Sequence, residues 1–241
     1  MESTPDLDQG SPKRLRKEDS PSDPTNKECK FPTSVAVGVD VECGSDRVGA
    51  LPSQIGYCAV TSDGVELFCL SHPIKVNWGP YASLERLMED ASFPMISEYL
   101  DVSPGCVSDF WLKKMPKGSW ERIQERAMSP KGQFTAFWRD IQYLRSKYTK
   151  VSIVTDNAAY DIAKLNAGLE KYVPDSYPLW FSTPKDYTGI VDICRFKYLP
   201  GFAEVKKDVS ERFPHDHDPS HDARHIVNLY MGAQRILASQ K

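Results

Sequence analysis

The sequence predicts a mixed α/β fold, in which a sheet of antiparallel and then parallel strands is flanked by helices. Three observations predict it. Runs of alternating and β-branched residues come first, within 35–42, 54–60 and 65–71. Apolar residues at helical spacing follow them. Short apolar strands then alternate with helices, which is typical of a sheet that is covered on its faces.

The first strand is Ser34–Glu42, and the next two form a hairpin. Ser62, Asp63 and Gly64 separate the runs 54–60 and 65–71, and Asp-Gly between two such runs is typical of a hairpin turn. Because all three strands are joined by short links, we expect them to be antiparallel.

Later elements are predicted from periodicity and from end signals. An apolar stripe predicts a helix over 133–150, and a buried strand over 151–154 follows it, parallel to the first. Thr155 or Asp156 is expected to cap a helix that runs to Tyr172. A further strand is expected over 189–194, and the last helix is expected to begin at Pro219, since proline is favoured at the first helical position.

The chain divides into a tail and one domain. Residues 1–33 are rich in Ser, Pro and charged residues, which predicts disorder, and residues 34–241 form the folded domain. The tail contains the basic cluster Lys13-Arg14-Leu15-Arg16-Lys17. This cluster is interpreted as a nuclear localisation signal or a nucleic-acid-binding arm, with an ordinary solvated charge run as the alternative.

Composition narrows the class of protein. No run of 18 apolar residues is present, so no membrane span is expected. The six cysteines form no C-x-x-C pair, which argues against a zinc ribbon, and most of them lie in apolar stretches of the sequence. We therefore expect an intracellular protein, in the nucleus if the basic cluster is a signal and otherwise in the cytoplasm. The net charge of −3 does not favour binding to long duplex DNA, because the phosphate backbone attracts proteins with a positive charge.

Four acidic residues occupy suggestive positions. Asp40 and Glu42 end the first strand on one face, where hard divalent cations would offset their burial. Asp161 lies early in a helix and borders the sheet, although it could simply stabilise the helix dipole. Asp222 lies in the first turn of the last helix. Asp156 is expected to act only as a helix cap.

Histidines gather in front of the last helix. Four of the five in the chain lie within 215–225, where carboxylates surround them. Imidazole beside carboxylates is typical of a general base that works near neutral pH, and a polar solvated loop is the alternative.

In order and context, these residues resemble the motifs of the DEDDh 3′–5′ exonucleases of the RNase H-like superfamily. The motifs are Asp40-Val41-Glu42, then Asp156-Asn157-Ala158-Ala159-Tyr160-Asp161, then His217 with Asp222 five positions later. The resemblance covers roughly 34–237. The chain departs from it in two places, since Asp156 stands where the family often has His, and His217-Asp218-Pro219 stands where it often has H-x-A.

The resemblance implies a two-metal hydrolysis of phosphodiester bonds by Mg²⁺ or Mn²⁺, with no other cofactor. Asp40 would bridge two ions, Glu42 and Asp222 would hold one, and Asp161 would hold the other. His217 would be the general base, because His215 and His221 do not have the family spacing to Asp222. Phe110, Trp111 and Tyr160 could stack on bases, but Trp111 and Tyr160 are more often core residues.

The implied partners are 3′ ends of single-stranded DNA or RNA, and no motif distinguishes the two. No pattern indicates the oligomeric state. Two alternatives stay open: a catalytically silent nucleic-acid-binding module of the same fold, and an interaction protein that works through its tail.

Overall fold

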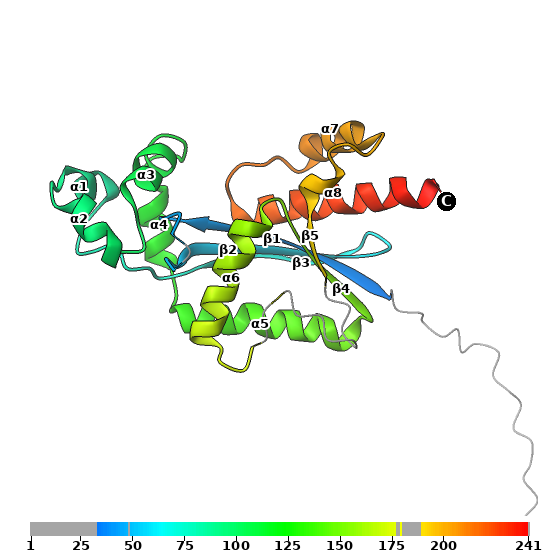
Figure 1. The fold of residues 1–241 in the computed structure, drawn as a ribbon, viewed down its shortest axis with the longest axis horizontal. Coiled ribbons are helices and arrows are strands. Elements are labelled where there is room, and N and C mark those ends of the chain that lie inside the picture. Colours follow the sequence, from blue (N-terminus) through cyan, green and yellow to red (C-terminus); the bar gives the residue numbers. More distant parts are fainter. Residues whose placement is uncertain (1–32, 48, 177–178, 180–188, 241) are drawn as a thin grey trace, which may run out of the picture. The chain divides into compact units, whose positions relative to one another are not determined.

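The protein is built on a five-stranded sheet in the order β3-β2-β1-β4-β5 (Figure 1). The computed structural model describes residues 33–47, 49–176, 179 and 189–240. The predicted tail, apart from residue 33, and its basic cluster lie outside the described residues. The strands are β1 (Ser34–Cys43), β2 (Pro52–Thr61), β3 (Glu66–Pro73), β4 (Lys150–Thr155) and β5 (Gly189–Asp192).

The pairing of the strands confirms the predicted mixed sheet. β1, β2 and β3 are antiparallel, whereas β4 pairs in parallel with β1 and β5 pairs in parallel with β4. β1 lies at the centre of the sheet, so the strand with the D-x-E motif has a neighbouring strand along each of its edges. The predicted strand 189–194 ends at Asp192, since Ile193–Phe196 form a 3₁₀ turn, η3, with the Asp192 side chain accepting a hydrogen bond from the Cys194 N–H.

Helices cover both faces of the sheet (Figure 1). α5 (Pro130–Lys147) and α6 (Ala158–Tyr172) lie on one face, and α7 (Phe202–Arg212) and α8 (Pro219–Ser239) lie on the other. The alternation of β1 supplies both cores: Val35, Val37 and Val39 pack toward α5 and α6, and Ala36 packs toward α8. The prediction that the first of these helices reaches residue 150 was wrong, because Tyr148 is already extended and residue 150 begins β4.

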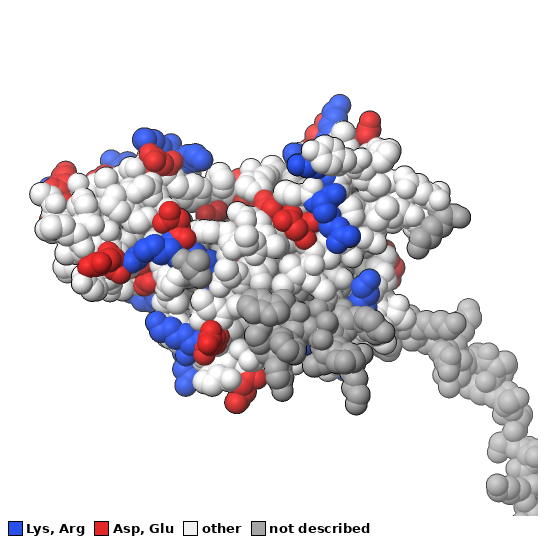
Figure 2. Space-filling model, viewed as in Figure 1, with Lys and Arg blue, Asp and Glu red and all other residues white. Residues whose placement is uncertain are grey.

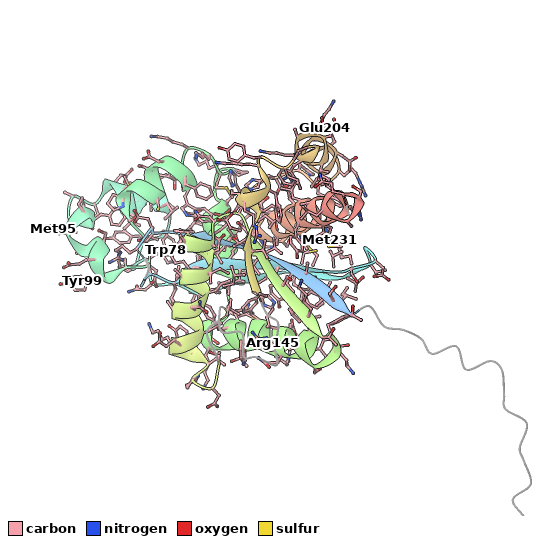
Figure 3. All side chains as sticks on the ribbon, turned by 45° about the vertical axis from the view of Figure 1, so that its right-hand side comes forward. Trp78, Met95, Tyr99, Arg145, Glu204 and Met231 are labelled. Atoms are coloured by element: carbon pink, nitrogen blue, oxygen red, sulfur yellow. The ribbon has the colours of Figure 1, made fainter. Side chains whose placement is uncertain are left out.

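Between β3 and α5 lies a group of short helices that the sequence did not predict. They are α1 (Leu84–Glu89), α2 (Phe93–Ile96), η1 (Ser97–Tyr99), α3 (Pro104–Cys106), the π-helical turn η2 (Val107–Trp111) and α4 (Ser119–Arg126). Buried Trp111 ties this group to the sheet, since its Nε1–H donates to the Cys43 carbonyl at 2.8 Å. Met95 and Tyr99 project outward from its far end (Figure 3).

The first turns of α8 touch the sheet backbone directly. A Cβ atom at Gly38 would lie 2.1 Å from the Ala223 carbonyl oxygen, and one at Gly56 would lie 1.9 Å from that of Pro219. Gly56 is the β2 partner of Asp40, so this close contact occurs beside the acid of β1. Among the described residues, none of the helices combines the length and the apolar character needed to cross a membrane.

Candidate metal-binding active site

The acids of β1 point toward the face that α8 covers. Asp40 and Glu42 are each only 9% exposed. Oδ2 of Asp40 is buried and has no hydrogen-bond partner among the described residues. A buried carboxylate oxygen without a partner is costly, so this atom calls for a ligand that the protein itself does not supply.

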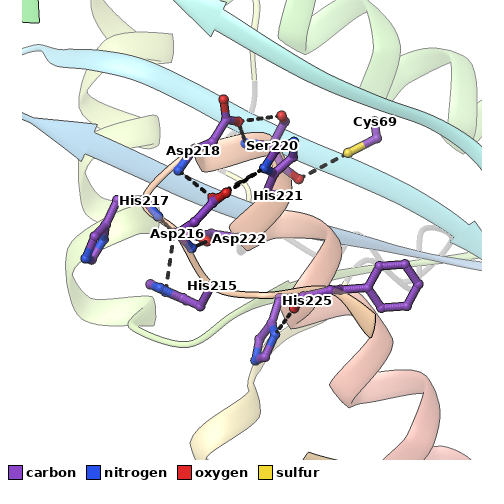
Figure 4. A network of polar contacts seen from close by, with 10 residues as sticks. Cys69, His215, Asp216, His217, Asp218, Ser220, His221, Asp222 and His225 are labelled. Atoms are coloured by element: carbon purple, nitrogen blue, oxygen red, sulfur yellow. Dashed lines mark hydrogen bonds and ion pairs between the residues drawn. The ribbon is translucent and has the colours of Figure 1, made fainter. Parts of the chain in front are cut away.

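Asp222 comes from the first turn of α8 (Figure 4). It is fully buried, and its carboxylate groups with those of Asp40 and Glu42. The helix begins as predicted: Pro219 takes the first position, and the Asp218 side chain accepts a hydrogen bond from the Ser220 N–H at 2.9 Å. The two carboxylate oxygens of Asp222 accept from the N–H groups of Asp216, at 3.0 Å, and His217, at 3.1 Å. The first turn of α8 therefore fixes both the acid and the loop before it.

Asp161 approaches from the first turn of α6 and is 3% exposed. The Thr155 hydroxyl, at the end of β4, donates a hydrogen bond to Oδ2 of Asp161. The same hydroxyl accepts from the Asn157 N–H at 3.2 Å, so it joins the end of the strand to the start of the helix.

The prediction that Thr155 or Asp156 caps this helix was wrong. The helix begins later, with Asn157 in the cap position and no side-chain cap bond. Asp156 is thereby free of the capping role, and its carboxylate groups with those of Asp40 and Asp161. Sequence reasoning missed this residue because aspartate is equally suited to capping and to metal binding.

The carboxylates form two groups that share Asp40. In one group Asp40, Glu42 and Asp222 offer oxygens that all lie within 4.8 Å of one another, and in the other Asp40, Asp156 and Asp161 do the same. Such oxygen sets are what Mg²⁺ and Mn²⁺ prefer. With the partnerless oxygen of Asp40, this donor set fits divalent cations.

Burial and mutual repulsion raise the pKa values of these acids. Burial, and then repulsion by Glu42, raises the pKa of Asp40 well above its usual value. Burial and Asp222 raise the pKa of Glu42 to about 8. Burial raises the pKa of Asp161 to about 7, and it also raises the pKa of Asp222, where His215 opposes it. Without cations, the protein therefore favours protons on this cluster, and bound cations would displace them.

His217 lies at the edge of the acidic cluster. Its Nδ1 is 3.7 Å from Oε1 of Glu42, and its ring meets the edge of Phe110, with centroids 5.0 Å apart. Its φ of 63° places it in the left-handed region, which is uncommon for a residue other than glycine. The half-exposed ring is thus held near the acids while it stays open to solvent.

His215 also belongs to this cluster, which the family spacing did not indicate. Its Nε2 lies 3.4 Å from Oδ2 of Asp222, and its ring stacks edge-on against His217. His221 instead pairs with Asp216, with Nδ1 at 3.0 Å from Oδ2 (Figure 4). Two histidines rather than one therefore face the acids.

Buried Lys164 fixes the loop that follows β1. Its Nζ donates to the carbonyl oxygens of Ser45 at 3.0 Å, of Ala50 at 3.3 Å, and of Arg47. It lies one helical turn after Asp161, so one part of α6 holds both an acid and the loop beside the other acids. Of the aromatic candidates, Trp111 is buried, whereas Phe110 and Tyr160 are partly exposed near the site.

Comparisons with known proteins place the fold. No protein-family model matches the chain, and no curated protein matches it. The solved structure of E. coli Exonuclease I in complex with a dA16 oligonucleotide is similar over 86% of this chain and 42% of that chain, with 12% identity and a TM-score of 0.50. The structure of cell-death related nuclease 4 (CRN-4) is similar over 85% and 65%, with 13% identity and a TM-score of 0.52.

The chain spans less than two thirds of the length of either of these nucleases. At these identities the similarity defines the fold, which is the RNase H-like fold: a mixed five-stranded sheet with helices on its faces.

Proposed function

We propose that this chain is a divalent-metal-dependent 3′–5′ exonuclease of the DEDDh type that acts on single-stranded nucleic acid. One observation carries the proposal: the acidic side chains form two sets of three, and Asp40 belongs to both sets. The fold, which the chain has in common with two nucleases, supports it.

In this proposal Asp40 would be shared by two Mg²⁺ or Mn²⁺ ions. Glu42 and Asp222 would hold one ion, and Asp161, with Asp156 beside it, would hold the other. When bound, the ions would neutralise the acids and stabilise the charge that develops on the phosphoryl group.

The general base is His217. Its ring is open to solvent and lies close to Glu42, so it can take a proton from an attacking water. Phe110 limits the rotation of the ring by packing against it, and the main-chain bond to Asp222 fixes its position.

The test is incubation of 5′-labelled single-stranded DNA and RNA oligomers with Mg²⁺ or Mn²⁺. The expected product is a ladder that shortens from the 3′ end, and 3′-labelled oligomers should release labelled mononucleotides first. Asp40→Asn and EDTA should abolish both. Oligomer binding with no cleavage would instead support the silent module, and internal cleavage of 3′-blocked oligomers would contradict exonuclease action.

A further inference from the structure

A cavity of about 490 Å³ lies between η3, α7 and α8, beside the acidic cluster. Its volume falls within the range of about 300–1,000 Å³ that is usual for small-molecule sites. Apolar side chains line its floor, among them Ile193, Phe202 and Ile226. These side chains come from three elements, so the cavity is part of the fold rather than a gap in one loop.

The cavity borders the candidate active site. Asp156 and His215 both line it. Both also belong to the acidic cluster, since Asp156 lies beside Asp40 and His215 lies beside Asp222. A ligand in the cavity would therefore touch residues beside the ion positions.

Two lysines without acidic partners stand at the cavity. Neither Lys206 nor Lys197 makes a hydrogen bond or ion pair within the described part of the chain, and the ammonium of Lys197 lies over the Tyr198 ring at 4.8 Å. Figure 2 shows red and blue side chains side by side on this face, in the region where Figure 1 places η3 and β5. Unpaired cations next to an apolar floor fit a ligand that carries both a flat apolar group and an anion.

A second cavity flanks the cluster on the side of His217. It has a volume of about 240 Å³ and is lined by Arg122, Arg126 and Gln54. Both cavities border the acidic cluster, and each is lined by two cationic side chains as well as by acidic ones. This arrangement would let a polyanionic strand cross the acidic centre once its charge is neutralised.

We propose that the cavity between η3, α7 and α8 binds one nucleotide unit of the substrate strand, next to the phosphate that is cleaved. The base packs against Phe202 and the exposed Ala203, and the backbone phosphate lies at Lys197 and Lys206. The proposal rests on the proposed function, because it takes a nucleic-acid strand as the substrate.

Cys194 provides a test that does not depend on activity. Its thiol is exposed, lines the cavity and donates to the Asp156 carbonyl at 3.3 Å. The full chain is incubated with iodoacetamide in a buffer that contains Ca²⁺, once with and once without a single-stranded oligomer. The rate at which each cysteine is alkylated is then measured by peptide mass spectrometry. We expect the oligomer to slow alkylation of Cys194 but not of Cys106, which lies in α3 outside the cavity.

Free dAMP, tested at the same concentration, separates a strand site from a product site. We expect much weaker protection by dAMP than by the oligomer. Equal or stronger protection by dAMP would overturn the proposal, and so would unchanged alkylation with the oligomer bound.

A matched pair of lysines tests the phosphate contact. Lys206 lines the cavity and Lys207 does not, although both are exposed on α7. Lys206→Ala should weaken oligomer binding and lower the slope of log affinity against log salt by about one, as expected for one lost phosphate contact. Lys207→Ala should leave both nearly unchanged.

The outcomes separate this proposal from the proposed function. If the chain cleaves oligomers but the two lysine variants bind alike, the cavity assignment fails and the nuclease proposal stands. If the chain cleaves nothing but the oligomer still protects Cys194, the cavity assignment stands as a nucleic-acid site and the nuclease proposal fails.

Discussion

The main chain of His217 is bound to Asp222: its N–H donates a hydrogen bond of 3.1 Å to Oδ2 of that buried carboxylate. The acid that would hold an ion therefore also holds the loop that carries the proposed base. Because the second oxygen of Asp222 accepts from Asp216, both of its oxygens fix this loop. Loss of Asp222 is thus expected to displace His217 as well as to remove an ion ligand.

His217→Ala should lower the single-turnover rate by about 10²–10⁴, which is usual for removal of a general base, and leave oligomer affinity unchanged. His221→Ala is the control and should keep most of the activity, because its ring pairs with Asp216 outside the acidic cluster. Rates at saturating Mg²⁺ decide between them.

The position of His215 near Asp222 makes His215→Ala the informative third variant. We expect a smaller loss than for His217→Ala, since its nitrogen faces a carboxylate that is itself a proposed ion ligand. A larger loss for His215→Ala would mean that the base is His215 and that the family spacing misassigned it.

Asp156→Ala should raise the Mg²⁺ concentration needed for half-maximal activity, because its carboxylate lies with those of Asp40 and Asp161 at one of the proposed ion positions. The effect should be smaller than that of Asp161→Ala, since Asp161 is the more deeply buried of the two. Stability should change little, because Asp156 caps no helix. Mg²⁺ titrations of both variants test this, and an unchanged titration for Asp156→Ala would remove it from the site.

Asp40→Asn should raise the melting temperature in EDTA. The substitution removes the carboxylate that both groups share, and repulsion among buried acids is relieved when no ion is present. The wild type, but not the variant, should gain stability on addition of Mg²⁺. Thermal melts with EDTA and with Mg²⁺ provide the measurement, and equal stabilisation of both proteins by Mg²⁺ would place the ion elsewhere.

Stability without metal should fall as pH rises. Burial raises the pKa of Glu42 from its usual 4.5 to about 8 in the folded protein. The folded state then binds this proton more tightly than the unfolded state does, so the contribution is full below about pH 4.5 and is lost as pH rises through 8. Glu42→Gln lacks this group and should lose less stability over that range. Melts of both proteins in EDTA across the range test the sign.

Gly56→Ala should destabilise the protein by about 1–3 kcal/mol, the usual cost of overpacking. Its Cβ would meet the Pro219 backbone and push the start of α8 away from β2. The matched control is Gly189→Ala in β5, where a Cβ would meet no atom within 4 Å. Urea unfolding gives both free energies, and equal values would show that α8 adjusts freely.

The central strands and the acids on them could be predicted because strand alternation fixes the face of each side chain. Asp40 and Glu42 are two residues apart on a central strand, so their shared face followed from sequence alone. Asp222 could be placed because Pro219 marks the start of its helix.

Other features depend on geometry that the sequence does not encode locally. Because α6 begins later than predicted, Asp156 does not cap it and lies in the acidic cluster instead. His215 reaches Asp222 across the left-handed residue His217, a conformation that residue type alone does not reveal. Apart from α4, the helices between β3 and α5 are too short to show a periodic apolar pattern.

The bonds of Lys164 have a consequence for the order in which the protein folds. They join α6 to carbonyl groups 114 to 119 residues earlier in the chain, so they close a very long loop. β1, β2 and β3 are neighbours in sequence and can pair early, but at that stage the acids of β1 have neither Asp161 nor Asp222 beside them. Binding of two ions would therefore occur only after α6 and α8 have packed on the sheet. A partly folded chain in which only β1, β2 and β3 are paired would not bind them.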